Sequence, residues 1–533
     1  MRNRSIDNPP SSFSQSNPLK SGSRMVTRAV PVIALLVLAG CASKIDKLPD
    51  EAQLTVPEAW QTTPIVVTTE ESAASISTDQ VSPKDTSAAV ENGWLNRFAD
   101  EDLNNYVDIA LRNNPDLWAS SAQLKTAIEQ VTVTGANLWP NLRAGVSSNR
   151  TDRETDGITT EIRTVSGTLE INWEADVWGK LTQRRRAAAY SAQAQAELYN
   201  AAELSLVANV SRAWFNLMTN KLQLDLAQQR LESFQNTAKL IEENYERGLR
   251  SALDVYLSRT DVQRQIANLS DSKFSYISSL RAFKTLLGEY PSLSMDFEAK
   301  LPTLTGPIPA GLPAELLTRR PDVKASQLLY KSEIANAKAA NRDRFPTISF
   351  TGSIGDSRDE FNQLFDNNNM VMTLIGGIAQ PIFQAGALKS REDQAYYQAE
   401  SAYASLVKTT LNAFQEVENS LTREQTLREQ HKAILEAVRL AQGGLDLALD
   451  RYQTGIENYT TVLQSQRSLF DSMLSEINIR NALLQNRISI HLALGGDFAT
   501  QEQRADNQTL PSPTQAQASM ESVEESEPAT DTE

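Results

Sequence analysis

The residues that most often carry chemistry in proteins are scarce in this chain of 533 residues. It contains one cysteine, Cys41, and two histidines, His431 and His491. The histidines are far apart and have no cysteine near them, so they lack the ligand spacing of a zinc site. The sequence contains neither a glycine-rich phosphate-binding loop nor a nucleophile motif. We therefore expect no catalytic constellation and no resident metal.

Cys41 lies where a lipid is attached in bacterial lipoproteins. The apolar run 29–39 follows two arginines, ends in small residues and is too short to span a bilayer, as in a signal peptide. The sequence Leu38-Ala-Gly-Cys41 resembles the processing motif of lipoproteins. Since a sole cysteine cannot form an internal disulfide, the alternative is a chance cysteine in a cleaved peptide. We predict a lipoprotein signal peptide at 1–40, with Met25 as an alternative start, and a covalent lipid on Cys41 as the only prosthetic group.

The residue after Cys41 and the two ends of the chain refine this prediction. Ala42 stands where an aspartate would favour retention in the inner membrane, so we expect anchorage in the outer membrane. Residues 41–93 have the composition of an extended linker after the acylated end. Residues 498–533 form an acidic tail of disordered composition, which carries about half of the net charge of -15. The rest is only mildly acidic, which argues against nucleic acid as a partner.

The body of the chain contains two copies of one pattern. The matching positions, 206 or 207 residues apart, are Asn114 and Arg320, Pro140 and Pro346, and Gly248 and Gly455. A drift of one residue over a whole copy indicates internal duplication, which is typical of folds whose units cannot bury their surface alone. We predict repeat 1 at 94–310, consisting of a helix, a strand pair, a helix hairpin and an equatorial connector, and repeat 2 at 311–497.

Each copy contains a pair of segments with the alternating pattern of a strand. In repeat 1, residues 142–148 and 164–173 alternate apolar with polar side chains on either side of a charged loop. In repeat 2, residues 347–354 alternate similarly, and the partner segment 370–379 is apolar on both faces. Each segment has around ten residues, close to the ~9 to 11 of a tilted strand that crosses a bilayer. Such strands suit either the edge of a sandwich or the wall of a barrel.

Long helices follow each strand pair. Residues 179–247 carry apolar side chains at every seventh position from Val210, which is typical of coiled-coil packing. At ~1.5 Å per residue this helix would be about 100 Å long. Gly248 then turns the chain into a returning helix at 251–287, and Gly455 does the same in the second copy. The sequence therefore predicts two long helix hairpins.

The number of strands predicts how the chain assembles. Four strands cannot close a barrel, and open sheet edges are not tolerated in hydrocarbon. Two chains would give eight strands, whose side chains fill the interior, whereas three would give twelve and a wide pore. We predict a mixed α+β chain, mostly α, that forms a trimeric 12-stranded transmembrane β-barrel continued by a long α-helical coiled-coil barrel.

The same residues resemble a known family, the TolC-like outer-membrane factors, and within it the lipoprotein branch (NodT/OprM-like) that serves resistance-nodulation-division efflux systems. The resemblance runs from about Trp94 to Gly496. Its most specific stretches are Gly311 to Asp322, Trp173 to Lys180, Gln380 to Phe383 with Gly386, and Arg451 to Tyr459. It implies a homotrimer with an equatorial belt in mid-tunnel. It also implies docking to a periplasmic adaptor protein and an inner-membrane efflux pump.

The resemblance further implies that the tunnel closes at its periplasmic tip, where the hairpins turn. The residues that it places there are Gly248, Asp254, Gly455, Glu457, Gln464 and Arg467. Relatives often have a carboxylate one turn before the arginine, whereas this chain has Gln464 before Arg467, so an acidic ring at that level is in doubt. Arg467 is a candidate for an intersubunit hydrogen bond. The alternative is that these are solvated charges at helix ends.

Aromatic residues mark the ends of the predicted strands, and two proline motifs mark the starts of short helices. Trp139, Trp173 and Trp178 are expected at the membrane interface, with a packed core role as the alternative for Trp178. Asn114-Pro-Asp and Arg320-Pro-Asp are expected to break and cap short helices rather than to form a site.

Taken together, these features favour an outer-membrane channel of a tripartite efflux system. It would be a passive export duct for small molecules, anchored in the bilayer by lipid and driven by an inner-membrane pump through the adaptor. The alternative is a lipid-anchored periplasmic coiled-coil scaffold or adaptor, whose strands would form a small soluble sandwich. An enzyme is disfavoured because nothing pairs a nucleophile with a base. The cargo and the cognate pump are not encoded in any motif.

Overall fold

The computed structural model describes residues 57, 60–61, 93–304, 313, 316–364 and 370–496. All of them belong to one compact unit, Leu48–Glu533. The predicted signal peptide 1–40, the lipidation site Cys41 and the acidic tail 498–533 lie outside the described residues, as does most of the linker 41–93.

The first repeat opens with two short helices that break where the sequence predicts. Helix α2 (Glu101–Asn113) ends before Asn114, and α3 (Pro115–Gly135) starts after it. The Asn114 side chain accepts hydrogen bonds from two backbone N–H groups of α3, and proline occupies the first turn. Asn114 is therefore a side-chain N-cap, as expected. Short 3-10 helices lie on either side, at Trp94–Phe98 and Ala136–Leu138.

Four strands form a single antiparallel sheet in the order β1-β2-β3-β4. They are β1 (Asn141–Thr155), β2 (Ile158–Ala175), β3 (Thr347–Arg358) and β4 (Val371–Ala379). The predicted charged loop between the first two strands was too long. Both strands continue through it to a two-residue turn at Asp156 and Gly157, which have φ values of 53° and 82°. Asp-Gly is the preferred pair for a tight hairpin turn, so it sets the register and lengthens both strands.

Two long helix hairpins complete the fold, close to the predicted ranges. They are α4 (Lys180–Glu246) with α5 (Ala252–Leu286), and α8 (Ala387–Gln453) with α9 (Tyr459–Ala493). Both α4 and α8 contain 67 residues, or about 100 Å of helix. Before β3 the chain forms α6 (Leu316–Arg319) and α7 (Pro321–Arg342), and a 3-10 turn, Phe361–Gln363, follows β3.

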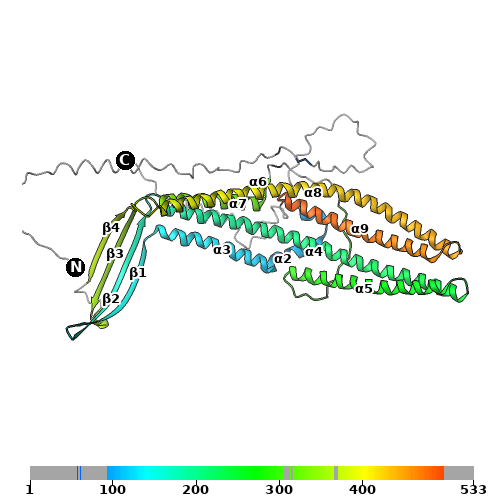
Figure 1. The fold of residues 1–533 in the computed structure, drawn as a ribbon, viewed down its shortest axis with the longest axis horizontal. Coiled ribbons are helices and arrows are strands. Elements are labelled where there is room, and N and C mark those ends of the chain that lie inside the picture. The colour runs from blue at the N-terminus through cyan, green and yellow to red at the C-terminus, as the bar shows by residue number, and fades with distance from the viewer. Residues whose placement is uncertain are drawn as a thin grey trace, which may run out of the picture. The chain divides into compact units, whose positions relative to one another are not determined.

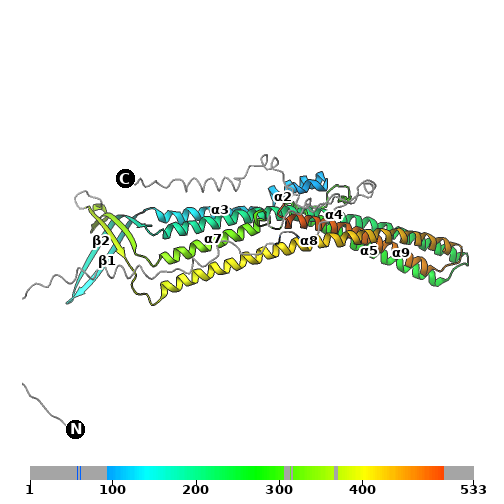
Figure 2. The ribbon, with the colours of Figure 1, turned by 90° about the horizontal axis from the view of Figure 1, so that it is seen from above.

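The helices lie side by side and continue from one end of the sheet. Helix α4 packs between α3 and α7, and α7 in turn packs against α8. The sheet lies at one end of this layer, and the turns of both hairpins lie at the other (Figures 1 and 2). The two hairpins meet where α4 contacts α9.

Two apolar cores hold the middle of the helices, the first formed mainly by repeat 1 with two residues of α9, and the second by repeat 2. The first surrounds Trp214, which contacts Tyr106, Phe283 and Phe297 and donates a hydrogen bond from Nε1 to Asp100 Oδ2 at 2.8 Å. The second surrounds Tyr330 on α7 and includes apolar residues of α8 and α9. Smaller apolar clusters lie between α4, α8 and α9, closer to the turns of the two helix hairpins.

Strand register repeats in the two copies. In the β1–β2 pair Asn141 pairs with Asn172, and in the β3–β4 pair Thr347 pairs with Ala379. The first strand is thus displaced by 206 residues and the second by 207, the same offsets that the sequence motifs show. The duplication inferred from sequence therefore extends to the pairing of individual residues.

Candidate functional site

The sheet has one apolar and one polar face. Most of the exposed apolar side chains fall on one side, and this apolar face comprises Leu142, Val146, Leu169, Ile171, Trp173, Phe350, Ile354, Met372, Leu374 and Ile378. Four exposed apolar side chains lie on the other side: Ile158, Ile162, Val371 and Ile375. The opposite, polar face carries Arg143, Glu170, Asn172, Glu174, Ser349, Thr351, Ser353 and Thr373. Thr351 Oγ1 donates to Asn172 Oδ1 at 2.9 Å across two strands of the polar face. This arrangement suits a wall between lipid and water.

The three predicted aromatic residues gather where the strands meet the helices. Trp139 is 74 % exposed just before β1. Trp173 stacks on Phe350 at 5.7 Å, and Trp178 stacks on Phe345 at 5.4 Å and donates from Nε1 to the Pro346 carbonyl at 2.7 Å. A partly exposed ring with a satisfied N–H is what a membrane interface favours.

Charged side chains continue the polar face into the helices. Lys180 at the start of α4 lies 2.5 Å from Glu174 Oε1 of β2 and 3.8 Å from Asp343. One helical turn later, Arg184 Nη2 lies 3.1 Å from Asp343 Oδ1. These ion pairs join β2, α4 and the end of α7 on the side of the sheet that is polar.

The predicted tip glycines form the turns of both hairpins. Gly248 and Gly455 have φ values of 76° and 81°, a left-handed conformation that glycine adopts without strain. Asp254 lies in the first turn of α5, where its backbone N–H is capped by Ser251, and Glu457 accepts a hydrogen bond from Thr461 Oγ1 at 3.2 Å. Both acids therefore make local contacts near helix starts.

Arg467 forms a contact that the sequence did not reveal. Its Nη2 donates to Asp261 Oδ1 at 2.9 Å, which connects α9 with α5 across the two hairpins. The Asp261 side chain is buried and also accepts a hydrogen bond from Tyr459 Oη at 3.4 Å. Burial, followed by the nearby Asp261 charge, raises the pKa of the Tyr459 hydroxyl, so it remains a donor. Gln464 is exposed one turn away. The predicted intersubunit bond of Arg467 stays a prediction.

A second contact joins the two turns themselves. The guanidinium of Arg250, just after the first turn, lies 4.1 Å from the ring centroid of Tyr452 and donates to the Tyr452 backbone carbonyl. Tyr452 is the second-last residue of α8, where helix carbonyls lack intrahelical donors and attract a cation. Neither Arg250 nor Tyr452 was predicted, because no periodicity distinguishes a loop arginine that crosses between hairpins.

Helix packing between the hairpins uses polar side chains as well. Gln466 of α9 is fully buried and donates from Nε2 to Thr237 Oγ1 at 2.8 Å and to Ser233 Oγ at 3.1 Å, both on α4. Beside this contact, an open cavity of about 380 Å³ is lined by residues of α4 with Leu449 of α8. The contact between α4 and α9 therefore includes buried hydrogen bonds and is not purely apolar.

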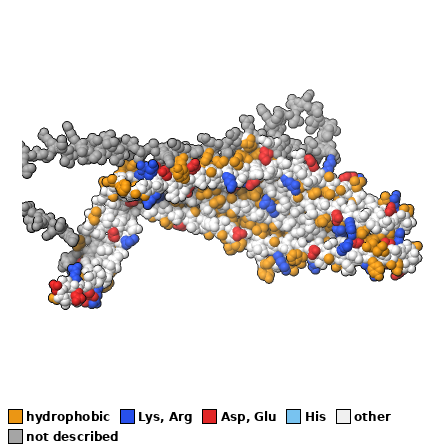
Figure 3. Space-filling view, viewed as in Figure 1, with side chains coloured by type: hydrophobic (Ala, Val, Ile, Leu, Met, Phe, Trp, Pro, Cys, Tyr) orange, Lys and Arg blue, Asp and Glu red, His pale blue; other side chains and the backbone are white. Residues whose placement is uncertain are grey.

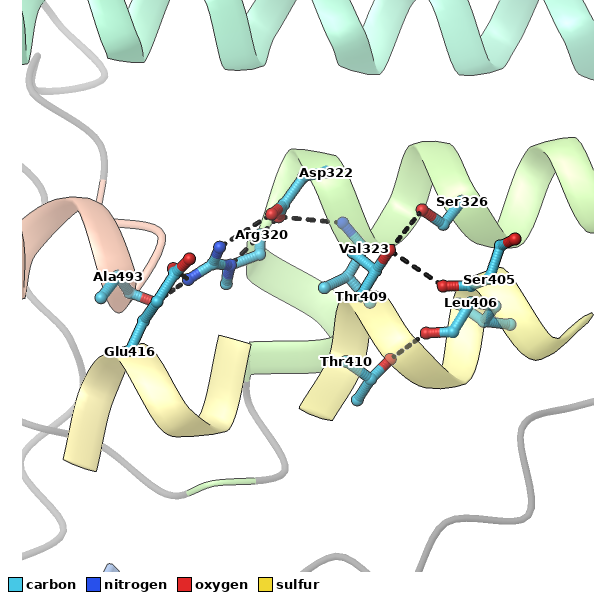
Figure 4. Close-up of polar contacts among 10 residues, drawn as sticks. All are labelled: Arg320, Asp322, Val323, Ser326, Ser405, Leu406, Thr409, Thr410, Glu416 and Ala493. Atoms are coloured by element: carbon cyan, nitrogen blue, oxygen red, sulfur yellow. Dashed lines mark hydrogen bonds and ion pairs between the residues drawn. The ribbon is translucent and has the colours of Figure 1, made fainter. Parts of the chain in front are cut away.

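The Arg320-Pro-Asp motif starts a helix as predicted, since Arg320 is the N-cap residue of α7, but the Arg320 side chain has another role. It makes no side-chain cap on α7. Instead its guanidinium, mostly buried, binds both oxygens of Asp322, Glu416 Oε2 at 2.8 Å and the Ala493 carbonyl at 3.0 Å (Figure 4). Because arginine has donors only, it cannot accept from the helix N–H groups as Asn114 does. Arg320 therefore joins α7, α8 and the end of α9.

The remaining chemistry of the described residues is sparse. They contain no group of three or more His, Cys, Asp or Glu side chains that could hold a metal. His491 is buried and stacked on Trp94 at 5.5 Å, and burial, followed by Arg487 and Arg97, lowers its pKa to about 3.

No helix within the described ranges combines the length and the apolarity needed to cross a membrane. Charged side chains cluster at the β1–β2 turn, where Arg150 pairs with Asp152 and Glu161 (Figure 3).

Comparison with protein families identifies both halves of the chain. A family model described as outer membrane efflux protein matches residues 106–289 and again residues 312–496. Each match lies within one of the two predicted repeats, and together the matches cover most of the chain.

Individual relatives cover most of the same region. A probable efflux pump outer membrane protein, TtgC of Pseudomonas putida, is 30% identical over 431 residues, which is 79% of this chain and 88% of that protein. The cation efflux system protein CusC of Escherichia coli is 28% identical over 407 residues, 76% of this chain and 88% of its own.

A solved structure agrees with the fold. The CmeC outer membrane channel of Campylobacter jejuni superposes with a TM-score of 0.72 at 21% identity, covering 84% of this chain and 97% of CmeC. The two matches of the family model, the level of identity to TtgC and the two-faced sheet with its long helix hairpins give one conclusion. This chain belongs to the outer membrane efflux protein family and is an outer-membrane transport channel rather than an enzyme.

Proposed function

We propose that three copies of the chain form one export duct. Their sheets close a 12-stranded barrel in the outer membrane, and their helices continue it as a tunnel into the periplasm. The observation that carries the proposal is the two-faced sheet, whose polar face leads into long helices that lie side by side. Twelve strands enclose a water-filled pore, whereas four leave open edges in lipid.

The sheet also argues against the alternative of a soluble scaffold or adaptor. A small sandwich would need a second layer to bury its apolar face. In the described residues there is one sheet, and apolar side chains such as Leu374 and Ile378 are exposed on it. Hydrocarbon covers such a face without a second protein layer.

The duct is part of a tripartite system in this proposal. An acyl chain on Cys41 anchors the mature N-terminus in the bilayer, and the aromatic residues Trp139, Trp173 and Trp178 lie at its interface. A periplasmic adaptor binds the hairpin tips and connects the duct to an inner-membrane pump. Relatives named as efflux pump and efflux system components support this arrangement.

The hairpin tips act as the gate. The bonds of Arg467 and Tyr459 to Asp261 hold the two hairpins of one chain together. Adaptor binding would open the tunnel by separating these helices. The acids Asp254 and Glu457 lie near the turns and add negative charge to the entrance, whereas Gln464 adds none.

The cargo is a class of small molecules selected by the pump. Relatives are named for toluene and for cations, which share little chemistry. A water-filled passage with few specific contacts suits such different cargoes, so the duct itself is passive.

Planar-bilayer recording of the purified full chain tests this function. The expected result is stepwise conductance from a species with three times the chain mass. A protein that remains monomeric and gives no conductance would contradict the proposal. Labelling at the β1–β2 turn in intact cells adds a topological test, because a channel exposes Asp156 outside the cell and a scaffold does not.

A further inference from the structure

The apolar face of the sheet ends in charged residues on the side away from the helices. Since side chains alternate along a strand, the residues two and four positions beyond Val165 on β2 stay on this face. They are Arg163 and Glu161, and their partners on β1 are Arg150 and Asp152. These four residues form the charged band. Figure 3 shows red and blue side chains gathered at this end of the sheet.

The length of β2 places the charged band at the outer edge of the bilayer. Trp173 and Arg163 lie on the same face of this strand, ten positions apart. At ~3.3 Å per residue they are separated by about 33 Å of strand. A tilt of about 40° reduces this to about 25 Å, the height of the apolar band in transmembrane barrels. With Trp173 at the periplasmic interface, as proposed above, Arg163 and Arg150 lie at the headgroups of the outer leaflet.

The charged band has two layers of like charge. Arg150 is directly opposite Arg163, and Asp152 is directly opposite Glu161. Like charges that face each other across two strands destabilise a sheet. The cationic layer lies next to the apolar residues, and the acidic layer lies two residues further out along each strand. An anion bound at the edge of the hydrocarbon would offset the repulsion between the two arginines.

Glu161 holds both guanidinium groups and leaves donors for a ligand. Its Oε2 lies 3.3 Å from Arg150 Nη2, and its Oε1 accepts a hydrogen bond from Arg163 Nε. Arg150 Nε also donates to Asp152 Oδ1 at 3.2 Å. A guanidinium has five N–H donors, and within the described residues Arg163 uses only Nε. The side chains of Arg150 and Arg163 are 56 % and 62 % exposed, so their other donors are accessible.

A third arginine on the same face is engaged within the protein. Arg358 of β3 is opposite Val165, and its Nε lies 2.9 Å from Asp356 Oδ2. The side chains of Arg358 and Asp356 are 18 % and 1 % exposed, so this pair is largely covered. Its carboxylate neutralises the arginine from inside the sheet. The exposed cationic charge at this level therefore comes from Arg150 and Arg163.

We propose that Arg150 and Arg163 bind the phosphate groups of outer-leaflet lipids. The planar fork of an arginine matches two oxygens of a phosphate, and such charge-assisted bonds are stronger than neutral ones. The inference rests on the proposed channel, because that topology puts the β1–β2 turn outside the cell. The apolar face and the cationic layer are continuous on one side of β1 and β2. One lipid molecule can therefore contact the apolar face with its acyl chains and the arginines with its phosphates.

Native mass spectrometry of the purified full chain tests this site. The probe is a bisphosphorylated lipid A, and the comparison ligands are the same lipid without its phosphates and phosphatidylglycerol. The test variant combines Arg150→Gln with Arg163→Gln. The matched control combines Arg143→Gln with Arg153→Gln, which removes two positive charges from the polar face of β1.

The test variant should bind the bisphosphorylated lipid at least about tenfold more weakly than the unchanged chain, because it loses charge-assisted bonds. The control should bind it as the unchanged chain does. Removal of the phosphates from the lipid should weaken binding to the unchanged chain by a similar factor. Equal binding by the two double variants overturns the proposal, as does undiminished binding of the dephosphorylated lipid. Tighter binding of phosphatidylglycerol than of the bisphosphorylated lipid overturns the assignment to the outer leaflet.

Planar-bilayer conductance of the same preparations separates this site from the channel function. A test variant that conducts as a trimer and binds less lipid supports the site and shows that the variant folds. A test variant that conducts and binds the lipid undiminished overturns the site alone. An unchanged chain that gives no conducting trimer overturns the channel and, with it, the lipid site.

Discussion

Asp261 of α5 and Arg467 of α9 are 2.9 Å apart, and they join two hairpins that are far apart in sequence. The aspartate side chain is buried, whereas the arginine is half-exposed. Asp261 also accepts a hydrogen bond from Tyr459 Oη and one from Arg264 Nη1 at 3.2 Å. Three donors around one buried carboxylate make it the centre of the contact between the hairpins near the tip.

Replacing Arg467 with alanine should favour the open tip. Loss of one charge-assisted hydrogen bond costs about 1.5 to 3 kcal/mol when buried and less at this exposure. We expect roughly a tenfold higher open probability in single-channel recordings, since about 1.4 kcal/mol changes an equilibrium tenfold. Arg439→Ala is the control, because Arg439 and Glu436 form an exposed pair within α8. Equal effects of both variants would show that Arg467 has no gating role.

Acidification should destabilise the helical body through His491. Its pKa is about 3 in the folded chain and near 6.5 when unfolded, so only the unfolded chain binds a proton between these values. The neutral, buried His491 makes its full contribution to the free energy of unfolding above pH 6.5. That contribution is lost as the pH falls toward 3, at about 1.4 kcal/mol per pH unit.

Urea denaturation followed by circular dichroism at several pH values measures this effect. His491→Phe keeps a ring to stack on Trp94 and should flatten the dependence between pH 6.5 and 4. His431→Gln, at the only other histidine, should leave it unchanged. An unaltered pH profile in His491→Phe would refute the assignment.

Arg320→Ala should lower stability more than Arg320→Lys. The alanine variant leaves Glu416, Asp322 and the Ala493 carbonyl without the cation that joins them. Because the two carboxylates are 39 % and 56 % exposed, water can solvate them once the arginine is gone, and the cost should be that of a lost charge-assisted hydrogen bond, about 1.5 to 3 kcal/mol, rather than that of a broken buried pair. Lysine keeps the charge but cannot bind Asp322 through two donors. The midpoint of thermal unfolding should follow the order arginine, lysine, alanine, and any other order would argue against the proposed contacts.

Alanine should have unequal effects at Gly248 and Gly288, two glycines that share a left-handed backbone conformation. At Gly248 a β-carbon would meet no atom within 4 Å, so the cost is the conformational strain of about 1 kcal/mol. At Gly288 the β-carbon would lie 2.5 Å from the Asn113 carbonyl oxygen, which forces the start of repeat 1 to move. Thermal unfolding should show the larger loss for Gly288→Ala. Similar losses would mean that the contact relaxes at little cost.

A charge on the apolar face of the sheet should disrupt membrane insertion. Leu374→Arg exposes a cation to hydrocarbon at a cost of about 2 to 4 kcal/mol near the bilayer centre. Thr373→Arg, one residue away on the polar face, is the matched control. The yield of trimer in isolated outer membranes should fall only for Leu374→Arg. Tolerance of both substitutions would contradict the assignment of the lipid face.

Sequence patterns predicted the elements because they are set by local rules. Alternation predicted the strands, apolar heptads from Val210 predicted the long helices, and Gly248 and Gly455 predicted the turns. The error at the β1–β2 turn came from treating charged residues as loop, although Asp156-Gly157 was itself a hairpin signal. The helix start at Arg320 was predicted correctly, but its side chain does not cap α7 as that of Asn114 caps α3, because the proline motif was given the same role in both copies.

The sequence by itself determined the duplication, the two-faced strands and the helix hairpins, since each depends on spacing along one segment. Only the tertiary structure decided which side chains meet across segments: Arg467 with Asp261, Arg250 with Tyr452, and Arg320 with Ala493. On a coiled-coil surface many polar positions are equivalent by period, and a change of helix rotation selects different partners. These contacts therefore follow from the packing of the helices, which no local pattern records.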